Sequence, residues 1–395
     1  MPQRWPVIEV EHAQVRKHGQ AAFGDVWHCV RADRGRVIAV LADGLGSGIK
    51  ANVLANLTAT MAARYVQADA DLRRAAATIM ETLPVCSVRQ IAYSTFTIVD
   101  MDRRGRTRLV NFDNPTSVIL RRAQVLDLPR EEFSLATASG RPAVLRFVEF
   151  QAVPGDRVVL FSDGVSQAGV GTAAMPLGWG RSAIQQELLR KVQAEPGLGG
   201  RSLCRHLVGR ALALDGHQAK DDITCGVISY RHPRELLLIT GPPVARERDR
   251  QIAEMSREFE GRKVICGGST ANLVARELGL ELKMPLNLRN LDPEVPPTCG
   301  LEGFDLVTEG AITLATLTRL LEEDDLEGRR PNAATQLAAL LLESDVIRIV
   351  AGTRINEALQ DPNLPADLDI RRNILRRLQR VLTGKYLKDV DLKFV

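Results

Sequence analysis

The sequence has no cysteine pair spaced as Cys-x-x-Cys, few aromatic residues and no long apolar run. Its six cysteines are scattered along 395 residues, so no zinc site is readable and a disulfide framework is not expected. No stretch reaches the roughly 18 apolar residues that a membrane helix needs. The N-terminus also has no apolar segment of the signal-peptide type. These absences predict a protein of the reducing cytoplasm, with no membrane partner.

Neither sign of charge dominates the chain. There are 52 basic and 48 acidic residues, which gives a net charge of +4, and they are not clustered. Aromatic residues make up 4% of the sequence, so few rings are available for stacking on bases. We therefore expect no nucleic-acid partner. The 45% of hydrophobic residues is typical of a globular protein, and the length suggests two or three domains, each with its own core.

The first part of the chain alternates runs of strands with runs of helices. Apolar, β-rich segments are expected at 20–31, 36–42, 91–100, 106–112, 116–127, 156–162 and 222–230. Segments with helical spacing cover 50–66, 71–82, 182–194 and 201–214. Strands grouped in this way predict an α+β domain built in layers rather than a parallel sheet.

The pattern changes near His232. The strands expected beyond it are each followed by a glycine-containing loop and a helix, and they cover 235–240, 263–266, 304–308 and 346–350. This repeat predicts a smaller α/β domain with a mostly parallel sheet. We therefore predict two domains, residues 1–232 and residues 233–395. Several prolines predict a long excursion over 285–303.

Four short acidic segments carry the clearest chemistry of the first domain. Asp25 lies inside a predicted strand, Asp43 and Asp163 follow apolar strands, and Asp221 and Asp222 open the last strand. A carboxylate at the end of a buried strand is costly unless something compensates it. If these side chains converge, they need cations, and oxygen ligands favour Mg²⁺ or Mn²⁺.

Each of these segments also has a simpler interpretation. Asp-Gly is among the commonest turn dipeptides, so each one taken alone predicts a turn. The segment Asp43–Gly48 could also be a phosphate-binding loop at the start of a helix. It lacks the lysine of a P-loop, however, and the spacing of a dinucleotide-binding fingerprint. The joint pattern of four acidic segments favours the cation site.

The order of these motifs resembles the metal-dependent PPM-type serine/threonine phosphatases, and specifically their SpoIIE-like bacterial branch. The motifs are Gly24-Asp25, DGLGSG from Asp43, PGDRVVLFSDGVSQAG from Pro154 and DDIT from Asp221. The resemblance covers roughly residues 5–230. The segment Asn-Phe-Asp-Asn-Pro at 111–115 departs at three central positions from the family's Asn-Ala-Gly-His-Pro turn.

The resemblance implies a PPM-type β-sandwich flanked by helices. It also implies hydrolysis of phosphoserine or phosphothreonine on a protein, by a water activated between two divalent ions, Mn²⁺ or Mg²⁺. By the same resemblance Asp43 bridges the two ions and helices 50–82 can shift it. It assigns the metal site and the catalytic carboxylates to Asp25, Asp43, the Gly44 carbonyl, Asp163 and Asp221, with Asp222 as the alternative to its neighbour.

Basic residues near the N-terminal strands are weaker candidates. A general acid could be one of the histidines His12, His18 and His28, although structural histidines are commoner. A phosphate contact could come from Arg16, Lys17 or Arg31, although a solvated surface charge is the commoner case for each.

The resemblance further implies a phosphorylated regulator of the anti-sigma antagonist type as the protein substrate. Two alternatives stay open: a vestigial phosphatase that acts as a binding module, and an enzyme for a small phosphorylated metabolite. The assembly is left open between a monomer and a homodimer.

In the second domain, the predicted strand ends carry glycine, serine, threonine and arginine. They are Gly241, residues 267–270, Glu309-Gly310 and residues 352–354. Ligands bind outside the carboxyl ends of strands in doubly wound sheets, and helix starts suit anions. We therefore hypothesise a small anionic ligand or a partner peptide at these ends. Ordinary tight turns are the alternative.

Overall fold

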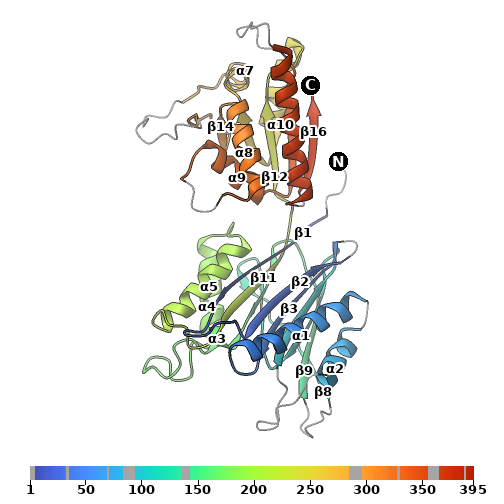
Figure 1. Cartoon of the computed structure of the whole chain (residues 1–395), viewed down its shortest axis with the longest axis vertical. Coiled ribbons are helices and arrows are strands. Elements are labelled where there is room, and N and C mark those ends of the chain that lie inside the picture. Colours follow the sequence, from blue (N-terminus) through green and yellow to red (C-terminus); the bar gives the residue numbers. More distant parts are fainter. Residues whose placement is uncertain are drawn as a thin grey trace. The chain divides into compact units, whose positions relative to one another are not determined.

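The computed structural model describes residues 5–32, 35–68, 71–82, 94–135, 143–283, 296–326, 330–354, 364–386 and 388–395. The chain divides into two compact units, Met1–His232 and Pro233–Val395 (Figure 1). This division coincides with the boundary expected at residue 232. None of the helices in the described ranges combines the length and the apolarity needed to cross a bilayer.

The first unit contains two antiparallel sheets. One has the order β1 (Val7–Val15), β11 (Ile223–Arg231), β10 (Asp156–Phe161), β6 (Val118–Arg121) and β7 (Gln124–Val125). The other has the order β2 (Asp25–Arg31), β3 (Val37–Gly44), β4 (Ser94–Met101), β5 (Arg106–Phe112), β9 (Ala143–Gln151) and β8 (Glu131–Leu135). A core shared by both sheets, with Leu41 and Leu109 packed against Leu160 and Ile228, makes them a sandwich.

Helices cover both outer faces of the sandwich (Figure 1). The helices α1 (Ile49–Gln67) and α2 (Leu72–Thr82) pack on the β2–β3–β4–β5 sheet through a run of buried alanines and Ile79. The short α3 (Asp163–Ser166), with α4 (Arg181–Ala194) and α5 (Gly200–Leu214), packs on the other sheet. The predicted PPM-type sandwich flanked by helices is confirmed.

Several strands of this unit differ from the prediction. The strands β1, β8 and β9 were not predicted. In the edge strand β1, charged and polar residues mask the alternation of a half-buried strand. The strand expected over 20–31 begins only at Asp25. The strand expected over 116–127 is two short strands, β6 and β7, separated by a turn in which Arg122 has a positive φ of 56°.

The second unit is built on a sheet of five parallel strands. Their order is β14 (Leu306–Thr308), β13 (Arg262–Cys266), β12 (Glu235–Thr240), β15 (Val346–Ala351) and β16 (Asp389–Phe394). Every neighbouring pair is parallel, which confirms the mostly parallel sheet. The excursion expected over 285–303 lies largely outside the described residues.

Helices cover both faces of the parallel sheet. On one face lie α8 (Ala311–Glu323), α9 (Ala333–Glu343) and α10 (Leu364–Gly384), packed against Leu236 and Val264. On the other face, the 3-10 turn η2 (Arg246–Arg248) leads into α6 (Asp249–Glu258), and α7 (Gly268–Leu278) follows β13. These two helices pack against Ile239 and Ile265, which alternate with the residues of the first face.

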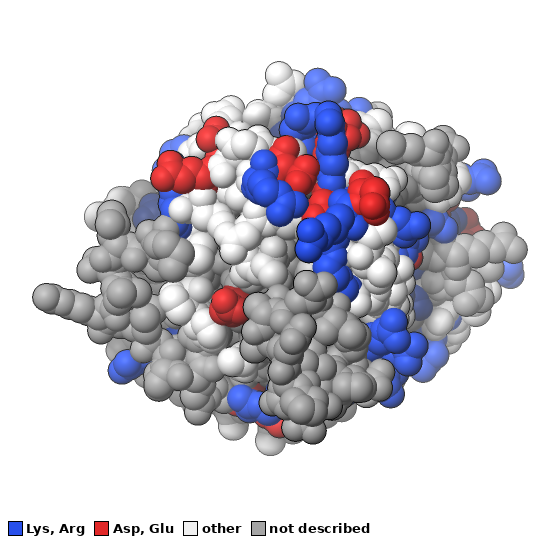
Figure 2. Space-filling view, turned by 90° about the horizontal axis from the view of Figure 1, so that it is seen from above, with Lys and Arg blue, Asp and Glu red and all other residues white. Residues whose placement is uncertain are grey.

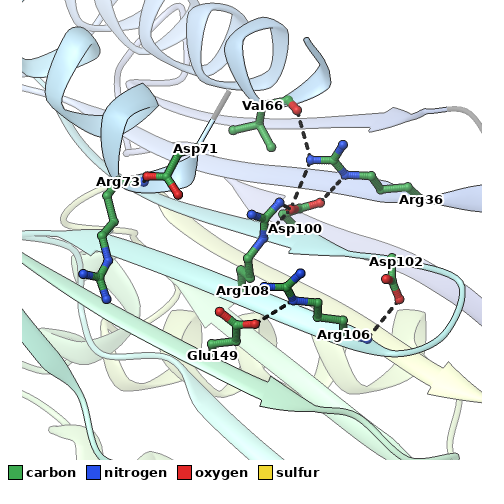
Figure 3. Close-up of polar contacts among 9 residues, drawn as sticks. All are labelled: Arg36, Val66, Asp71, Arg73, Asp100, Asp102, Arg106, Arg108 and Glu149. Atoms are coloured by element: carbon green, nitrogen blue, oxygen red, sulfur yellow. Dashed lines mark hydrogen bonds and ion pairs between the residues drawn. The ribbon is translucent and has the colours of Figure 1, made fainter. Parts of the chain in front are cut away.

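A buried ion cluster ties α1 to the sheet beneath it (Figure 3). Asp100 of β4 is 3% exposed and accepts hydrogen bonds from Arg36 Nε at 2.6 Å and from Arg108 Nε at 3.0 Å. The second terminal nitrogen of Arg36 donates to the carbonyl of Val66, in the last turn of α1, at 3.0 Å. The cluster therefore fixes the C-terminal end of this helix.

We predict that Asp100→Ala lowers the free energy of unfolding of the first unit by about 3 kcal/mol, because it leaves two half-buried guanidinium groups without their acid. All three tryptophans, Trp5, Trp27 and Trp179, lie in this unit, so tryptophan fluorescence in a urea titration reports on it alone. The control is Arg106→Ala, which removes an exposed ion pair with Glu149 and should change little. Equal losses in both variants would contradict the role of the cluster.

Candidate metal centre

The predicted carboxylates meet at one edge of the sandwich. Asp25 and Asp43 are direct cross-strand partners on β2 and β3. Asp163 follows β10, and Asp222 immediately precedes β11, the neighbour of β10. The two sheets join here, since the Gly24 amide donates to Asp222 Oδ2 at 2.7 Å.

Burial makes this acidic group unstable as a set of bare anions. Burial first, and then neighbouring carboxylates, raise the pKa of Asp43 to about 9. Burial likewise raises the pKa of Asp25 to about 8, against the hydrogen bond that it accepts from Thr224. Burial and the charge of Asp221 raise the pKa of Asp163. Near neutral pH such a group holds protons unless a cation takes their place.

The donor set suits a hard divalent cation, because it offers carboxylate and backbone carbonyl oxygens. In the ranges that the structure describes, no three His, Cys, Asp or Glu side chains stand close enough together to hold an ion as they are placed. The acids nevertheless fit a divalent metal in chemistry and in charge.

The two adjacent acids of the last segment have different surroundings. Asp222 is 3% exposed, and its oxygens accept from the backbone amides of Lys17 at 2.9 Å and Gly24 at 2.7 Å. Both oxygens are thus occupied in holding the chain. The Asp221 side chain is 42% exposed and lies 3.5 Å from Lys17 Nζ. Asp221 Oδ1 also accepts from the Asp222 amide at 3.0 Å, whereas Asp221 Oδ2 has no hydrogen bond within the described residues, so Asp221 is the more available of the two carboxylates.

The glycines after Asp43 and Asp163 are required by close backbone contacts. A Cβ at Gly44 would collide with the carbonyl of Ala51 in the first turn of α1. A Cβ at Gly164 would collide with the carbonyl of Asp222. These contacts give the Asp-Gly pairs a packing reason beyond turn formation, and they place the start of α1 directly on the strand end that carries Asp43.

Sequence reasoning missed the hydroxyl groups that brace the acids. Thr224 Oγ1 donates to Asp25 Oδ2 at 2.6 Å. Ser162 Oγ donates to the Asp222 carbonyl at 3.1 Å and accepts from the Thr224 amide at 3.1 Å. Both hydroxyl residues lie in the motifs that carried the resemblance. Their positions next to the acids in the sequence were the signal that could have predicted this role.

The turn at 111–115 is held by its own amide side chains. Asn114 Nδ2 donates to the carbonyl of Leu41 at 3.1 Å, and Asn114 Oδ1 accepts from Thr95 Oγ1 at 2.6 Å. Thr95 is the cross-strand partner of Asp43. The turn therefore supports the end of β3 from the side opposite Asp25.

The basic residues that were candidates for a catalytic or phosphate-binding role differ in how close they lie to the acids. Lys17 lies at the acidic edge, beside Asp221. His12 instead stacks on Trp27, with ring centroids 5.8 Å apart and planes 16° from parallel. Arg16 donates to the carbonyl of Ala21 at 3.1 Å. Of these three basic residues, Lys17 is the one placed to meet an anion at the site.

Comparison with known proteins finds a family match that covers most of the first unit. The family model described as Stage II sporulation protein E (SpoIIE) matches residues 33–231. No curated protein matches the chain significantly.

Several solved structures are similar. The SpoIIE phosphatase domain from Bacillus subtilis is 18% identical over 58% of this chain and 95% of that chain, with a TM-score of 0.43. The RsbU and RsbW domains of Rv1364c from Mycobacterium tuberculosis are 15% identical over 64% of this chain and 70% of that chain, with a TM-score of 0.45. RsbX in complex with magnesium is 18% identical over 56% and 95%, with a TM-score of 0.39.

Substitution of the two adjacent acids should separate their roles. We predict that Asp222→Asn lowers the free energy of unfolding of the first unit by about 1–3 kcal/mol, because one buried amide loses its acceptor. Asp221→Asn should leave this stability unchanged and weaken Mn²⁺ binding at least tenfold. Urea titration and calorimetry measure the two effects. If Asp221→Asn lowered the free energy of unfolding and Asp222→Asn did not, the roles of the two acids would be exchanged.

Proposed function

Since the chain belongs to the SpoIIE family, we propose that its first unit hydrolyses phosphoserine or phosphothreonine on a protein, with Mn²⁺ or Mg²⁺ as cofactor. This unit is a PP2C-type phosphatase domain. The observation that carries the proposal is the convergence of Asp25, Asp43, Asp163 and Asp221 at one edge of the sandwich. Of these acids, Asp25 alone precedes the matched residues 33–231.

Two divalent ions would supply an ionised water as the nucleophile and charge stabilisation for the phosphoryl oxygens. Asp43 would hold both ions, the Gly44 carbonyl one of them, and Asp163 and Asp221 the other. Asp25 would serve the second ion through water molecules. Because Gly44 and Gly164 bring the backbone close, the acids are held on rigid strand ends rather than on free loops.

The remaining residues of the edge position these acids. Thr224 donates to Asp25 and fixes one of its oxygens. Asp222, with both oxygens bonded to amides, keeps the Lys17 and Gly24 segments against the start of β11. Lys17 balances the charge of Asp221 and can meet a phosphoryl oxygen.

A protein substrate is favoured over a small metabolite by the surface of α1. Ile49, Val53 and Leu57 are 71%, 58% and 46% exposed and recur every fourth residue, so they form one apolar stripe. The stripe begins beside Gly44 and the acidic edge. Exposed apolar stripes of this kind mark protein contacts. We propose a phosphorylated regulator of the anti-sigma antagonist type as the substrate.

Contact between α1 and the acidic edge also suggests how activity is regulated. The first turn of α1 touches Gly44, and its last turn is fixed by Arg36. A shift of the helix would therefore move Asp43.

We propose that the second unit binds a small anionic ligand that regulates the phosphatase. We also propose that the chain acts in the cytoplasm, where its free cysteines stay reduced.

Hydrolysis of p-nitrophenyl phosphate tests the reaction. We predict turnover with Mn²⁺, none with EDTA, and a loss of at least a hundredfold in Asp43→Ala and in Asp163→Ala, because each substitution removes a metal ligand. Glu132→Gln, which breaks an exposed ion pair far from the acids in sequence, is the control and should keep full activity. Turnover that survives EDTA, or that survives both alanine variants, would overturn the two-metal assignment.

A further inference from the structure

The parallel strands of the second unit all end at the same edge of their sheet, which is where a ligand is expected. The chain starts at the central β12, adds β13 and β14 on one side, and then adds β15 and β16 on the other. Ligands of such sheets bind outside the carboxyl ends of the strands. Figure 2 looks down on the end to which these strands point in Figure 1, where Lys and Arg side chains alternate with Asp and Glu.

Glycines bring the strand ends close together. A Cβ at Gly352, after β15, would collide with the carbonyl of Pro242, after β12. A Cβ at Gly310, after β14, would lie 3.5 Å from the Cα of Gly267, after β13. A Cβ at Gly267 would lie 4.0 Å from the Gly241 amide nitrogen, after β12. Three neighbouring strand ends, those of β12, β13 and β14, therefore share one small space around Gly267.

The helix α7 opens toward this space. Its N-cap is Gly267, with φ 137° and no capping side chain, and the first bond of the helix runs from the Ala271 amide to the Gly267 carbonyl at 2.9 Å. The amides of Gly268, Ser269 and Thr270 precede that bond, so the helix gives them no partner. Such a start, positive in its dipole, favours an anion.

A buried hydroxyl points to a ligand independently of the helix. Thr270 is 1% exposed, and its Oγ1 has no hydrogen-bond partner among the residues that the structure describes. This oxygen lies 3.2 Å from the position that a Cβ on Gly267 would take, so it faces the shared space. An unpaired buried hydroxyl costs free energy, and a bound acceptor would remove that cost. Thr313 holds the same place after Gly310 in α8, and its hydroxyl is also buried and has no partner within the described ranges.

One cation and one acid border the space. Arg371 Nη1 lies 2.8 Å from the position of a Gly241 Cβ, and within the described chain Arg371 has no acidic partner. In contrast, Arg276 and Arg354 are both engaged with Asp249. Glu309 is exposed, with Oε1 3.2 Å from the position of a Gly268 Cβ and Oε2 accepting from the Gly310 amide at 3.2 Å.

We propose that residues 267–270 bind the phosphate of a small phosphate monoester that carries hydroxyl groups, as sugar phosphates and nucleotides do. The open amides and Thr270 Oγ1 donate to the phosphate, and Arg371 neutralises it. Glu309 would repel a bare anion, so its place beside the amides is explained by a hydroxyl that donates to it. This inference rests on the anion-binding role proposed for the second unit and gives that role a place and a ligand class.

Calorimetric titration of the full chain in EDTA tests the site, with ribose 5-phosphate and inorganic phosphate as probes. We expect ribose 5-phosphate to bind, and Arg371→Met and Thr270→Val each to weaken both probes about tenfold, as loss of a hydrogen bond to a charged group does. Glu309→Gln should weaken ribose 5-phosphate and strengthen inorganic phosphate. That opposite response distinguishes a ligand bearing hydroxyl groups from a plain phosphate site.

Matched variants keep this result separate from folding and from the metal centre. Arg372→Met removes the neighbouring charge of α10 and should bind as the wild type does, and Thr270→Ser should retain binding because it keeps the hydroxyl. Asp43→Ala should also bind normally, since the metal centre takes no part. The proposal would be overturned if ribose 5-phosphate did not bind the wild type. It would also be overturned if Arg371→Met and Thr270→Val bound ribose 5-phosphate as tightly as the wild type does. A wild type that binds ribose 5-phosphate but does not hydrolyse p-nitrophenyl phosphate would contradict the proposed phosphatase activity and leave the phosphate site of the second unit standing.

Discussion

Repulsion among buried carboxylates is the force that the first unit has to balance. Asp25, Asp43 and Asp163 lie on strand ends that the sandwich cannot separate, because cross-strand pairing and close glycine contacts fix the backbone. Burial raises the pKa of each of them, and neighbouring acids add to the shift. Under the proposed function, divalent cations would resolve this conflict and at the same time provide the chemistry of phosphate ester hydrolysis.

The same unit buries other acids in the opposite way. Asp100 is neutralised by Arg36 and Arg108, and Asp156 by Arg121. Near the metal centre, Lys17 approaches Asp221, while the more buried acids have backbone amides and hydroxyls as partners. This contrast separates acids that hold the fold from acids that we propose bind cations. In addition, α1 is anchored at Gly44, beside the acidic edge, and at Arg36 near its other end, so a shift of the helix would also move Asp43.

The sequence predicted both domain architectures and the acidic edge, because hydrophobic periodicity and strand-end acids are local signals. It could not choose between Asp221 and Asp222, since their difference lies in amides about 200 residues away along the chain. The edge strand β1 escaped detection because its charged residues hide the alternation. The order of the parallel strands was equally out of reach, as no local pattern encodes it. Only the structure shows that the Thr270 hydroxyl is buried with no partner in the part of the chain that it describes.

Binding of Mn²⁺ to the metal-free chain tests the central claim most directly. Calorimetry should show two ions bound per chain in the wild type and weaker or absent binding in Asp43→Asn. Tryptophan fluorescence in urea should show the first unit stabilised by about 2.7 kcal/mol when the free ion exceeds the dissociation constant about a hundredfold. Absence of Mn²⁺ binding in the folded wild type, or equal binding in Asp43→Asn, would contradict the account.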